Sequence, residues 1–399
     1  MSENKKESSL IVKLLVCIAI GIVIGLACVG SSFGRGVMQV MGSIQYFSGQ
    51  IIFYVVPLVV LAFIGPAIIR LGANASKMLF TGVGLAYCSS VGAAVFAYLG
   101  GLLLFNFLDI PTKTVDAERA MPEILFKFAI PPLMGVMTAL ITALLFGLAI
   151  IWSKSKTLEA VWNEFEQCVL FIVQKVVIPI LPFFIAATFS TLAYEGLITE
   201  QLPVFAKIIV IAIIGHFIWM FILYSIAGMI SKRNPWDVAK YYGPAYLTAV
   251  GTMSSAATLP VSLECARKSP ILSRETVDFM IPLGATVHLC GSVLTETLFI
   301  LVISQILYGG VPAFGTMVLF ILLFGFFAVG APGVPGGTVM ASLAIVISVL
   351  GFDTEGTALL IAIFALQDSF GTACNVTADG ALALMIEGIF GKKKESAQG

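Results

Sequence analysis

The chain has 399 residues, of which 59% are hydrophobic and only 11% are charged, and its mean hydropathy is +1.03. Soluble domains carry about 25% charged residues, so this composition indicates a membrane protein that crosses the bilayer several times. The formal net charge is zero, which argues against nucleic-acid binding. The seven cysteines stand singly and mostly in apolar runs, as small buried hydrophobes do, rather than as a disulfide framework or a metal site.

Hydrophobic runs divide the chain into eight candidate membrane spans. A hydrocarbon core about 30 Å thick requires roughly 20 apolar residues per helix, and several runs are longer, so tilted or broken helices are expected. The first run lacks a convincing signal-peptide cleavage pattern and is interpreted as a retained span. The spans are expected near residues 10–30, 44–69, 76–108, 123–152, 163–195, 203–231, 277–307 and 355–390.

Two further stretches, residues 235–270 and 311–352, are interrupted midway by small or helix-breaking residues. The first contains GTMSSAATLP, and the second contains VGAPGVPGG, whose prolines remove backbone donors. Non-helical backbone survives in a membrane only where protein buries it or where it lines a cavity. Both stretches are therefore predicted to be re-entrant hairpins whose tips meet inside the protein. The predicted fold class is an all-α polytopic membrane protein with eight transmembrane helices and two re-entrant helical hairpins.

Positively charged residues gather in alternate connections, which gives the orientation. The positive-inside rule places both termini in the cytoplasm, with the first hairpin entering from that side and the second from outside. We expect a multi-pass protein of the plasma (inner) membrane. The residues on the cytoplasmic side are Lys5, Lys6, Arg70, Lys77, Lys154, Lys156, Lys232, Arg233, Lys240, Arg267, Lys268, Arg274, Lys392, Lys393 and Lys394.

The last predicted span carries polar side chains on one face. Its residues Asp368, Thr372, Asn375 and Asp379 are spaced by four, three and four positions. At 3.6 residues per turn they share one side of the helix. A single Asn or Thr commonly joins two membrane helices, but two carboxylates on one face are costly there and indicate a function.

The hairpin tips provide further polar groups. Ser254, Ser255 and Thr258 lie in the first tip, and backbone groups are freed around Pro335 in the second. Exposed N–H and C=O groups at such tips can hold a carboxylate or coordinate a cation. Together with the polar face of the last span, the two tips predict a closed polar cavity.

The seventh span, with the sequence LGATVHLCGSVLTETLFI, carries His288 and Glu296. Hydrocarbon surroundings disfavour an ionised carboxylate, so Glu296 is expected to hold a proton, either as a structural group or as a carrier. Structural and functional roles are equally compatible with His288. The other histidine, His216, is assigned to packing.

Four motifs resemble those of the dicarboxylate/amino acid:cation symporter family, the glutamate transporter homologues. SSAATLPVSLECAR (254–267) is similar to the serine-rich signature of the first hairpin, and GVPGG (333–337) is similar to the tip of the second. NVTAD (375–379) resembles the N-V-x-G/A-D of the last helix, and GATVHLCGS (284–292) matches the frame of GAT-x-N-M-D-G-T. The resemblance covers nearly the whole chain in the same element order.

The resemblance implies a homotrimeric secondary transporter that works as an elevator. A fixed scaffold would comprise residues 1–75 (spans 1 and 2) and 111–200 (spans 4 and 5). A moving transport domain would comprise residues 76–110 (span 3) and 201–399 (span 6, first hairpin, span 7, second hairpin, span 8). The second hairpin would gate the site.

The resemblance also implies roles for individual residues. Asp368 would bind a substrate amino group and Asn375 its α-carboxylate. Asp379 would be a sodium ligand together with carbonyl groups near Gly284 and Asn375, because hard oxygen ligands suit that cation. The expected substrate-binding residues are Ser254, Ser255, Thr258, Val334, Pro335, Gly336, Asp368, Gly371, Thr372 and Asn375.

Two departures from the family pattern bear on the substrate. Gly371 stands where members that take acidic substrates carry an arginine, and Met253 stands where some members carry a first-hairpin arginine. An acidic side chain would then enter a low-dielectric pocket without a bidentate partner, at a cost on the order of several kcal/mol. A small neutral amino acid is therefore the expected substrate. The alternative is a sodium-coupled carrier of acidic amino acids or C4-dicarboxylates.

Other departures bear on the coupling ion. The N-M-D-G-T segment reads HLCGS at 288–292, without the asparagine and aspartate that the family ties to sodium. In the third span, Ser89, Gly92 and Ala93 stand where Tyr, Thr and Ser complete a deep sodium site, if the placement is ungapped. Thiol and imidazole groups are poor partners for sodium. Sodium dependence is therefore expected to be reduced or absent.

Glu296 falls where proton-coupled members carry a glutamate, so Glu296 and His288 are the candidates for proton coupling. No cofactor is expected, beyond Na⁺ at a reduced number of sites or H⁺. An ion channel is the rival of another class, although paired hairpins favour an occluded site. A membrane enzyme would require a nucleophile with a base or a metal set, which the sequence does not place. The expected partners are an amino acid substrate, membrane lipid and further copies of the chain.

Overall fold

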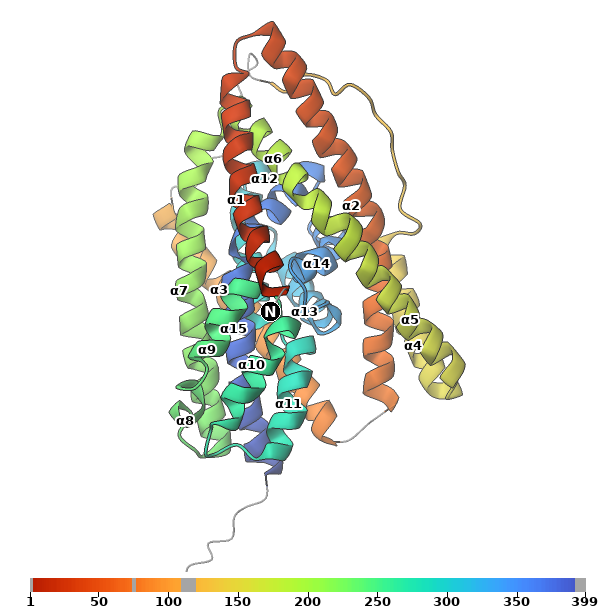
Figure 1. The fold of residues 1–399 in the computed structure, drawn as a ribbon, viewed down its shortest axis with the longest axis vertical. Helices are drawn as coiled ribbons and strands as arrows, with labels where there is room; N and C mark the ends of the chain where they lie inside the picture. Colours follow the sequence, from red (N-terminus) through yellow and green to blue (C-terminus); the bar gives the residue numbers. More distant parts are fainter. Residues whose placement is uncertain (1–2, 74–76, 109–119, 392–399) are drawn as a thin grey trace, which may run out of the picture.

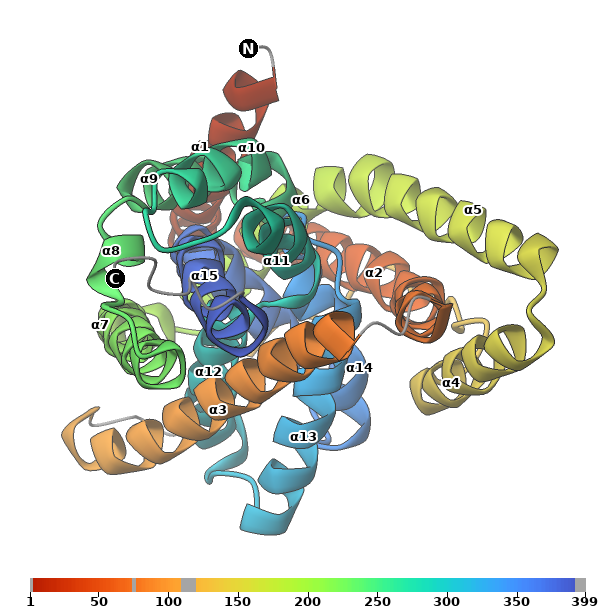
Figure 2. The same ribbon diagram turned by 90° about the horizontal axis from the view of Figure 1, so that it is seen from below.

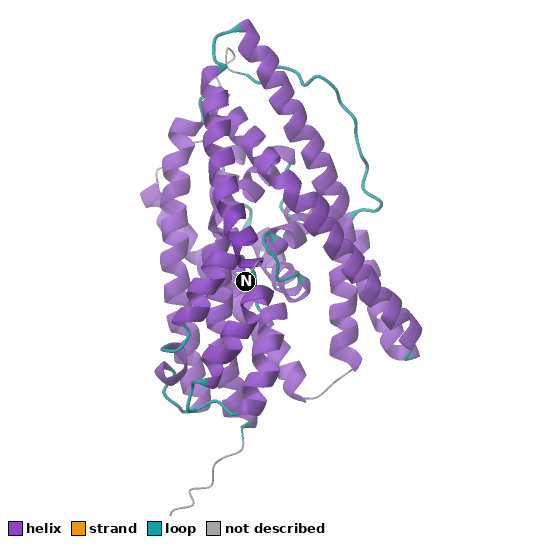
Figure 3. Cartoon of the chain, in the orientation of Figure 1, coloured by secondary structure: helices purple, strands orange, loops and turns teal. Residues whose placement is uncertain are grey.

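The computed structural model describes residues 3–73, 77–108 and 120–391 of the chain, and within these ranges every regular element is helical (Figure 3). The elements are α1 (Glu3–Ala27), α2 (Ser32–Ala73), α3 (Lys77–Leu108), α4 (Val136–Ser153), α5 (Lys156–Ile172), a π-helical turn η2 (Val173–Val177), α6 (Ile178–Tyr194), α7 (Ile198–Ser231), α8 (Trp236–Ala239), α9 (Gly243–Thr252), α10 (Ser255–Arg267), α11 (Arg274–Val287), α12 (Cys290–Tyr308), α13 (Phe314–Gly330), α14 (Gly337–Ser348) and α15 (Thr354–Phe390).

One group of helices gathers around α2, which contacts α4, α5 and α6 (Figure 1). α1 packs along α6 at very short range because two glycines of α1 face it. A Cβ at Gly21 would lie 2.2 Å from the Ala186 carbonyl oxygen, and one at Gly25 would lie 2.3 Å from the Ser190 carbonyl oxygen. Small residues of this kind let membrane helices approach backbone to backbone.

A second group surrounds α15, which lies among α7, α9, α11 and α12 when the molecule is seen end on (Figure 2). In the most apolar windows of the stretches Arg274–Tyr308 and Thr354–Phe390, 94% and 89% of the residues are buried. The corresponding value is 33% both for Lys156–Tyr194 in the first group and for Leu202–Ser231, in α7 of the second. The ionisable residues of α12 and α15 are therefore shielded by protein, which lowers the cost of keeping them in a membrane.

Two helix pairs fold back on themselves, α9 with α10 and α13 with α14. The first pair turns at Met253, which has a left-handed φ of 54°, and the next residue, Ser254, caps α10. The second pair ends its turn at Gly336, whose φ of 71° suits a residue without a side chain. The tips meet as predicted, because the Ser254 hydroxyl donates to the Gly333 carbonyl oxygen at 2.8 Å.

The predicted fourth span begins later than expected, at Val136 instead of near residue 123. The preceding segment, residues 120–135, is not helical and runs as a long loop along α2 (Figure 3). The amides of Leu125 and Ile130 donate to side chains of α2 at 3.0 and 2.9 Å. Two consecutive prolines, 131 and 132, lack backbone donors and oppose a helix there.

Six helical stretches within the described residues are long and apolar enough to cross a membrane. Two of them are interrupted, as the lengths of the hydrophobic runs predicted. The fifth predicted span consists of α5, η2 and α6, and the seventh consists of α11 and α12 with a break at His288 and Leu289. The first and fourth predicted spans correspond to shorter apolar helices, Lys13–Ala27 and Thr138–Ser153. The charged run 392–394 lies outside the described residues.

Candidate substrate and cation site

The two hairpin tips, the break between α11 and α12, and the polar face of α15 converge on one small cavity. Its volume is about 10 Å³, which is room for a single water molecule. A ligand larger than water can therefore enter only after the tips separate. The lining residues are Met253, Ser255, Leu289, Ser292, Pro332, Gly333, Val334, Thr338, Asp368, Thr372 and Asn375.

Most of the predicted substrate-binding residues lie at this cavity or directly beside it. Ser255, Val334, Asp368, Thr372 and Asn375 line it. Ser254 and Thr258 form a hydrogen-bonded turn just behind the first tip, since the Thr258 hydroxyl donates to the Ser254 carbonyl at 2.8 Å.

Asp368 ties the second hairpin to α15. Its Oδ2 accepts the N–H of Gly336 at 2.7 Å, and Thr372, one turn further along α15, lines the same cavity. Gly336 is the residue that caps the start of α14. The carboxylate therefore stands at the positive end of that helix dipole, which stabilises its charge. In this conformation the Asp368 carboxylate holds the tip of the second hairpin against α15.

Asn375 is occupied by the start of α12. Its Oδ1 accepts the N–H groups of Gly291 at 2.7 Å and Ser292 at 3.2 Å, and its Nδ2 donates to the Ser292 hydroxyl at 3.0 Å. The side chain thus satisfies two amides that a helix N-terminus leaves without intrahelical partners. The same amide faces the cavity, so a substrate carboxylate would share it with Ser292.

Glu296 connects α12 to α14. It is fully buried, and its Oε1 accepts the hydroxyl of Ser342, whereas its Oε2 has no partner among the described residues. A buried carboxyl group with an unpaired oxygen costs less free energy when protonated than when ionised. The second hairpin is therefore held by two carboxyl groups, Asp368 at its tip and Glu296 along its second helix.

His288 lies at the break between α11 and α12 and is fully buried. Its Nδ1 is 2.8 Å from Asp379 Oδ1, and its Nε2 is 2.9 Å from the Ser89 hydroxyl on α3. The imidazole therefore joins three elements that are far apart in the chain. Asp379 Oδ2 has no partner among the described residues.

The predicted sodium ligands do not form an open cage of oxygens here. The Gly284 carbonyl accepts the His288 N–H at 2.9 Å, and Asp379 Oδ1 faces the His288 ring. Asn375 Oδ1 already accepts two amides. Hard cations take about six oxygen ligands, and one carboxylate oxygen is left without a partner in this set. The residues as arranged do not fit a sodium ion.

Gly371 lies where α12 and α15 touch. A Cβ at Gly371 would be 3.3 Å from three atoms of Ser292, and one at Gly291 would be 2.5 Å from the Gly371 carbonyl oxygen. The two helices therefore meet through small residues. No lysine or arginine is found among the described residues that line the cavity.

Sequence reasoning missed a polar network behind the site. His216 Nε2 lies 3.0 Å from the Gly291 carbonyl oxygen and 2.9 Å from the Thr295 hydroxyl, which donates to Gln367 Oε1 at 2.7 Å. His216 is buried, as its assignment to packing predicts, and its ring also forms hydrogen bonds. The available signal was that Thr295 and Gln367 immediately precede Glu296 and Asp368 in the sequence.

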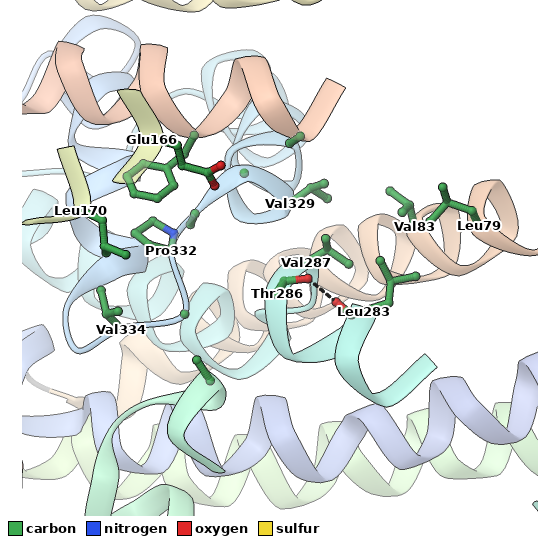
Figure 4. A pocket seen from close by; sticks show the side chains of 16 residues that line it. Leu79, Val83, Glu166, Leu170, Leu283, Thr286, Val287, Val329, Pro332 and Val334 are labelled. Atoms are coloured by element: carbon green, nitrogen blue, oxygen red, sulfur yellow. Dashed lines mark hydrogen bonds between the residues drawn. The ribbon is translucent and has the colours of Figure 1, made fainter. Parts of the chain in front are cut away.

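A larger cavity of about 390 Å³ borders the tip of the second hairpin (Figure 4). The tip residues Pro332 and Val334 form one side of it, with Leu170 and Glu166 of α5 nearby and Val83 of α3 at its other end. Most of its lining is apolar. The cavity borders the tip on one side, while Gly330, just before the tip, packs against Ile64 of α2.

Comparisons with known proteins place the chain in a family. The family model described as "Sodium:dicarboxylate symporter family" matches residues 10–389. The chain is 25% identical, over an alignment of 429 residues, to the neutral amino acid transporter B(0) of Bos taurus, covering 94% of this chain and 79% of that protein.

Two relatives named excitatory amino acid transporter 1 also match. The protein of Ambystoma tigrinum is 26% identical over 247 residues, covering 61% of this chain and 45% of the relative. The protein of Homo sapiens is 27% identical over 205 residues, covering 51% and 37%. The chain spans about half or less of the length of these two relatives. Because the family model covers nearly the whole sequence, the chain belongs to the sodium:dicarboxylate symporter family.

Proposed function

We propose that the chain is a secondary active transporter of a small neutral amino acid. The observation that carries this proposal is the cavity between the hairpin tips, which Asp368 lines with no lysine or arginine among the other described lining residues. One buried negative charge calls for one positive charge on the ligand. The ammonium group of an amino acid supplies it.

The substrate α-carboxylate would be met by the amide of Asn375 and by the hydroxyls of Thr372 and Ser255, all of which line the cavity. A second carboxylate, on an acidic side chain, would have no cation to pair with. Leaving it buried and unpaired costs about 3–5 kcal/mol. Tip backbone groups at Val334, Pro335 and Gly336 complete the proposed site.

Substrate binding and gating would be coupled through Asp368. Its carboxylate holds the Gly336 N–H at 2.7 Å, and an incoming ammonium would compete for the same oxygens. When the substrate ammonium replaces the Gly336 N–H as the donor to Asp368, the tip of the second hairpin is released. The neighbouring cavity of about 390 Å³ offers the space for that movement.

The rest of the architecture follows the same proposal. The helices around α2 (residues 1–75 and 111–200) would form a fixed scaffold. Those around α15 (residues 76–110 and 201–399) would form an elevator-like transport domain, with α9–α10 and α13–α14 as the two re-entrant hairpins among eight spans. A homotrimer in the plasma membrane, with lipid around it and both termini in the cytoplasm, completes the scheme.

For coupling we propose the proton, carried by Glu296. This residue is buried, bonds α14 through Ser342 and keeps one carboxyl oxygen without a described partner. A change of its protonation state would therefore alter the attachment of the second hairpin. His288, the second candidate, is already bonded at both ring nitrogens, so we favour Glu296.

The alternative is a sodium-coupled carrier of acidic amino acids or C4-dicarboxylates. The names of the excitatory amino acid transporters favour acidic amino acids. The lining of the cavity opposes this reading, because it contains no described cationic side chain.

Uptake into liposomes that contain the purified protein tests the proposal. A panel of labelled amino acids is offered under an inward proton gradient without sodium, and then under a sodium gradient at symmetric pH. Accumulation of a neutral amino acid under the proton gradient is expected. Accumulation of aspartate alone, driven only by sodium, would contradict both the substrate and the coupling. A steady current without saturable counterflow would indicate a channel.

A further inference from the structure

We infer that the imidazole of His288 permanently occupies the position beside Asp379. There it partners the Asp379 carboxylate, as a bound sodium ion would otherwise do. The inference deepens the coupling scheme of the proposed function and rests on it for its meaning in transport. Its physical content, the occupancy of a site by a tethered ring, stands on the geometry of α3, α11 and α15.

The imidazole lies between Asp379 and α3. It is fully buried and bridges Asp379 Oδ1 at 2.8 Å and the Ser89 hydroxyl at 2.9 Å. The contact depends on Gly284, because a Cβ there would lie 2.5 Å from Asp379 Oδ1. The carboxylate therefore presses against the backbone of α11 and reaches the ring one turn further along the chain.

The surroundings contain soft and aromatic groups as well as the hydroxyls of Tyr224 and Tyr242, which lie near Asp379. The thiol of Cys290 also lies against the His288 ring. On α3, Gly92 faces the indole of Trp219, and a Cβ at Gly92 would be 2.8 Å from that ring. Sulfur and indole groups are poor ligands for a hard cation.

A tethered occupant differs from a bound ion in its dependence on solution. An ion that binds the folded state stabilises it more as its concentration rises, whereas a covalently attached group stabilises it at every ion concentration. The wild-type protein should therefore show no sodium-specific change in thermal stability. Removing the ring should expose Asp379 and create such a dependence.

The test is thermal unfolding of the purified full-length protein in detergent, without substrate, in NaCl and in choline chloride at equal ionic strength and pH. The wild type is expected to have the same Tm in both salts. His288→Asn, which replaces the ring by a smaller group with an amide oxygen, should show a saturable rise of its Tm by a few degrees in NaCl only. Adding Asp379→Asn to His288→Asn should remove this response, because the carboxylate would hold the ion.

The matched control is His216→Asn. His216 is also a fully buried histidine in contact with α12, but its ring bonds the Gly291 carbonyl and Thr295 instead of a carboxylate. This variant should lose stability without gaining a sodium response. If His288→Asn does not fold, His288→Gln is measured under the same criteria.

Two results would overturn the inference: a sodium-specific rise of Tm in the wild type that Asp379→Asn removes, or folded His288 variants that do not respond to sodium. If neither His288 variant folds, the wild type decides, and equal Tm values in both salts support the inference. The assay contains no substrate and no gradient. Failure of neutral amino acid uptake would therefore refute the proposed function without touching this result, and a sodium response in the wild type would refute this inference without changing the substrate.

Discussion

The carboxylates of α15 and of its neighbouring helices differ in how completely their oxygens are hydrogen-bonded. The contrast is between the C-terminal end of α15 and its middle. At the end, Glu387 Oε2 accepts the amide of Ser273 at 3.0 Å and the hydroxyls of Ser273 and Thr276 at 2.6 Å each, while Arg233 reaches Oε1 at 3.3 Å. In the middle, Asp379 and Glu296 each keep one oxygen without a described partner.

This difference distinguishes a carboxylate that fixes neighbouring elements together from carboxylates that can exchange their hydrogen-bond partners. Glu387 joins the end of α15 to the loop before α11 and to the segment after α7, and both of its oxygens are satisfied by donors of the protein. Asp368 is bonded to the amide of Gly336 in the tip of the second hairpin, a contact that would be lost if the tip moved away from α15. Satisfied carboxylates stabilise a fold, whereas exchangeable ones allow a ligand or proton to change it.

The largest effect is expected from Asp368→Ala. A substrate ammonium would be left buried and unpaired, at a cost of roughly 3–5 kcal/mol, or more than a hundredfold in affinity. Binding of the amino acid, measured by calorimetry on purified protein, should become undetectable while the elution volume on size exclusion stays unchanged. Near-normal affinity would mean that the amino group is held elsewhere.

Glu296→Gln should remove proton-driven accumulation. Glutamine can keep a bond to Ser342 but cannot release a proton, so exchange of labelled for unlabelled substrate should continue at an altered rate. Accumulation under an inward proton gradient should fall by about tenfold or more, the equivalent of about 1.4 kcal/mol of lost driving force. A variant that accumulates substrate like the wild type would assign coupling to another group.

Glu387→Gln should act on stability and leave recognition intact. It removes the charge from four hydrogen bonds with Ser273, Thr276 and Arg233, and bonds to charged groups contribute about 1.5–3 kcal/mol. The Tm should fall by several degrees, with the Kd for substrate changed by less than about threefold. Wild-type stability together with lost binding would contradict the distinction between the two regions.

The smallest effect is expected from Gly371→Arg. A cation here would favour acidic substrates, but its Cβ would be 3.3 Å from three atoms of Ser292, so the side chain fits only if α12 shifts. We expect less than about a tenfold gain in relative affinity for aspartate. The double variant Gly371→Arg with Ser292→Gly relieves one contact and should gain more, which competition binding can compare.

The sequence allowed the polar face of α15 and the meeting of the hairpin tips to be predicted, because each rests on local rules. Helical periodicity aligns Asp368 with Asp379, and a broken helix in a membrane must bury its free backbone. The structure confirms the tips through Ser254 and Gly333. α4 begins later than its hydrophobic run predicts, because two adjacent prolines, 131 and 132, oppose a helix before Val136.

The partners of the polar groups could not be predicted in the same way. His288 meets Ser89 across 199 positions of sequence, and the bond of Asp368 to the Gly336 amide involves a backbone group that no side-chain pattern reveals. The sequence around His216 predicts a histidine on an apolar helix face. Its bond to Thr295 arises only from the packing of the two helices. Such contacts depend on how distant helices pack, which periodicity within one helix does not determine.

Competition binding on the wild-type protein tests the central claim most directly, because it asks which ligand the single charge of Asp368 selects. A bound labelled neutral amino acid is displaced by unlabelled alanine, serine, aspartate, glutamate and succinate in turn, without sodium. The account predicts displacement by the small neutral amino acids at concentrations at least about tenfold below those needed for aspartate, glutamate or succinate. Aspartate as the tightest competitor would contradict it.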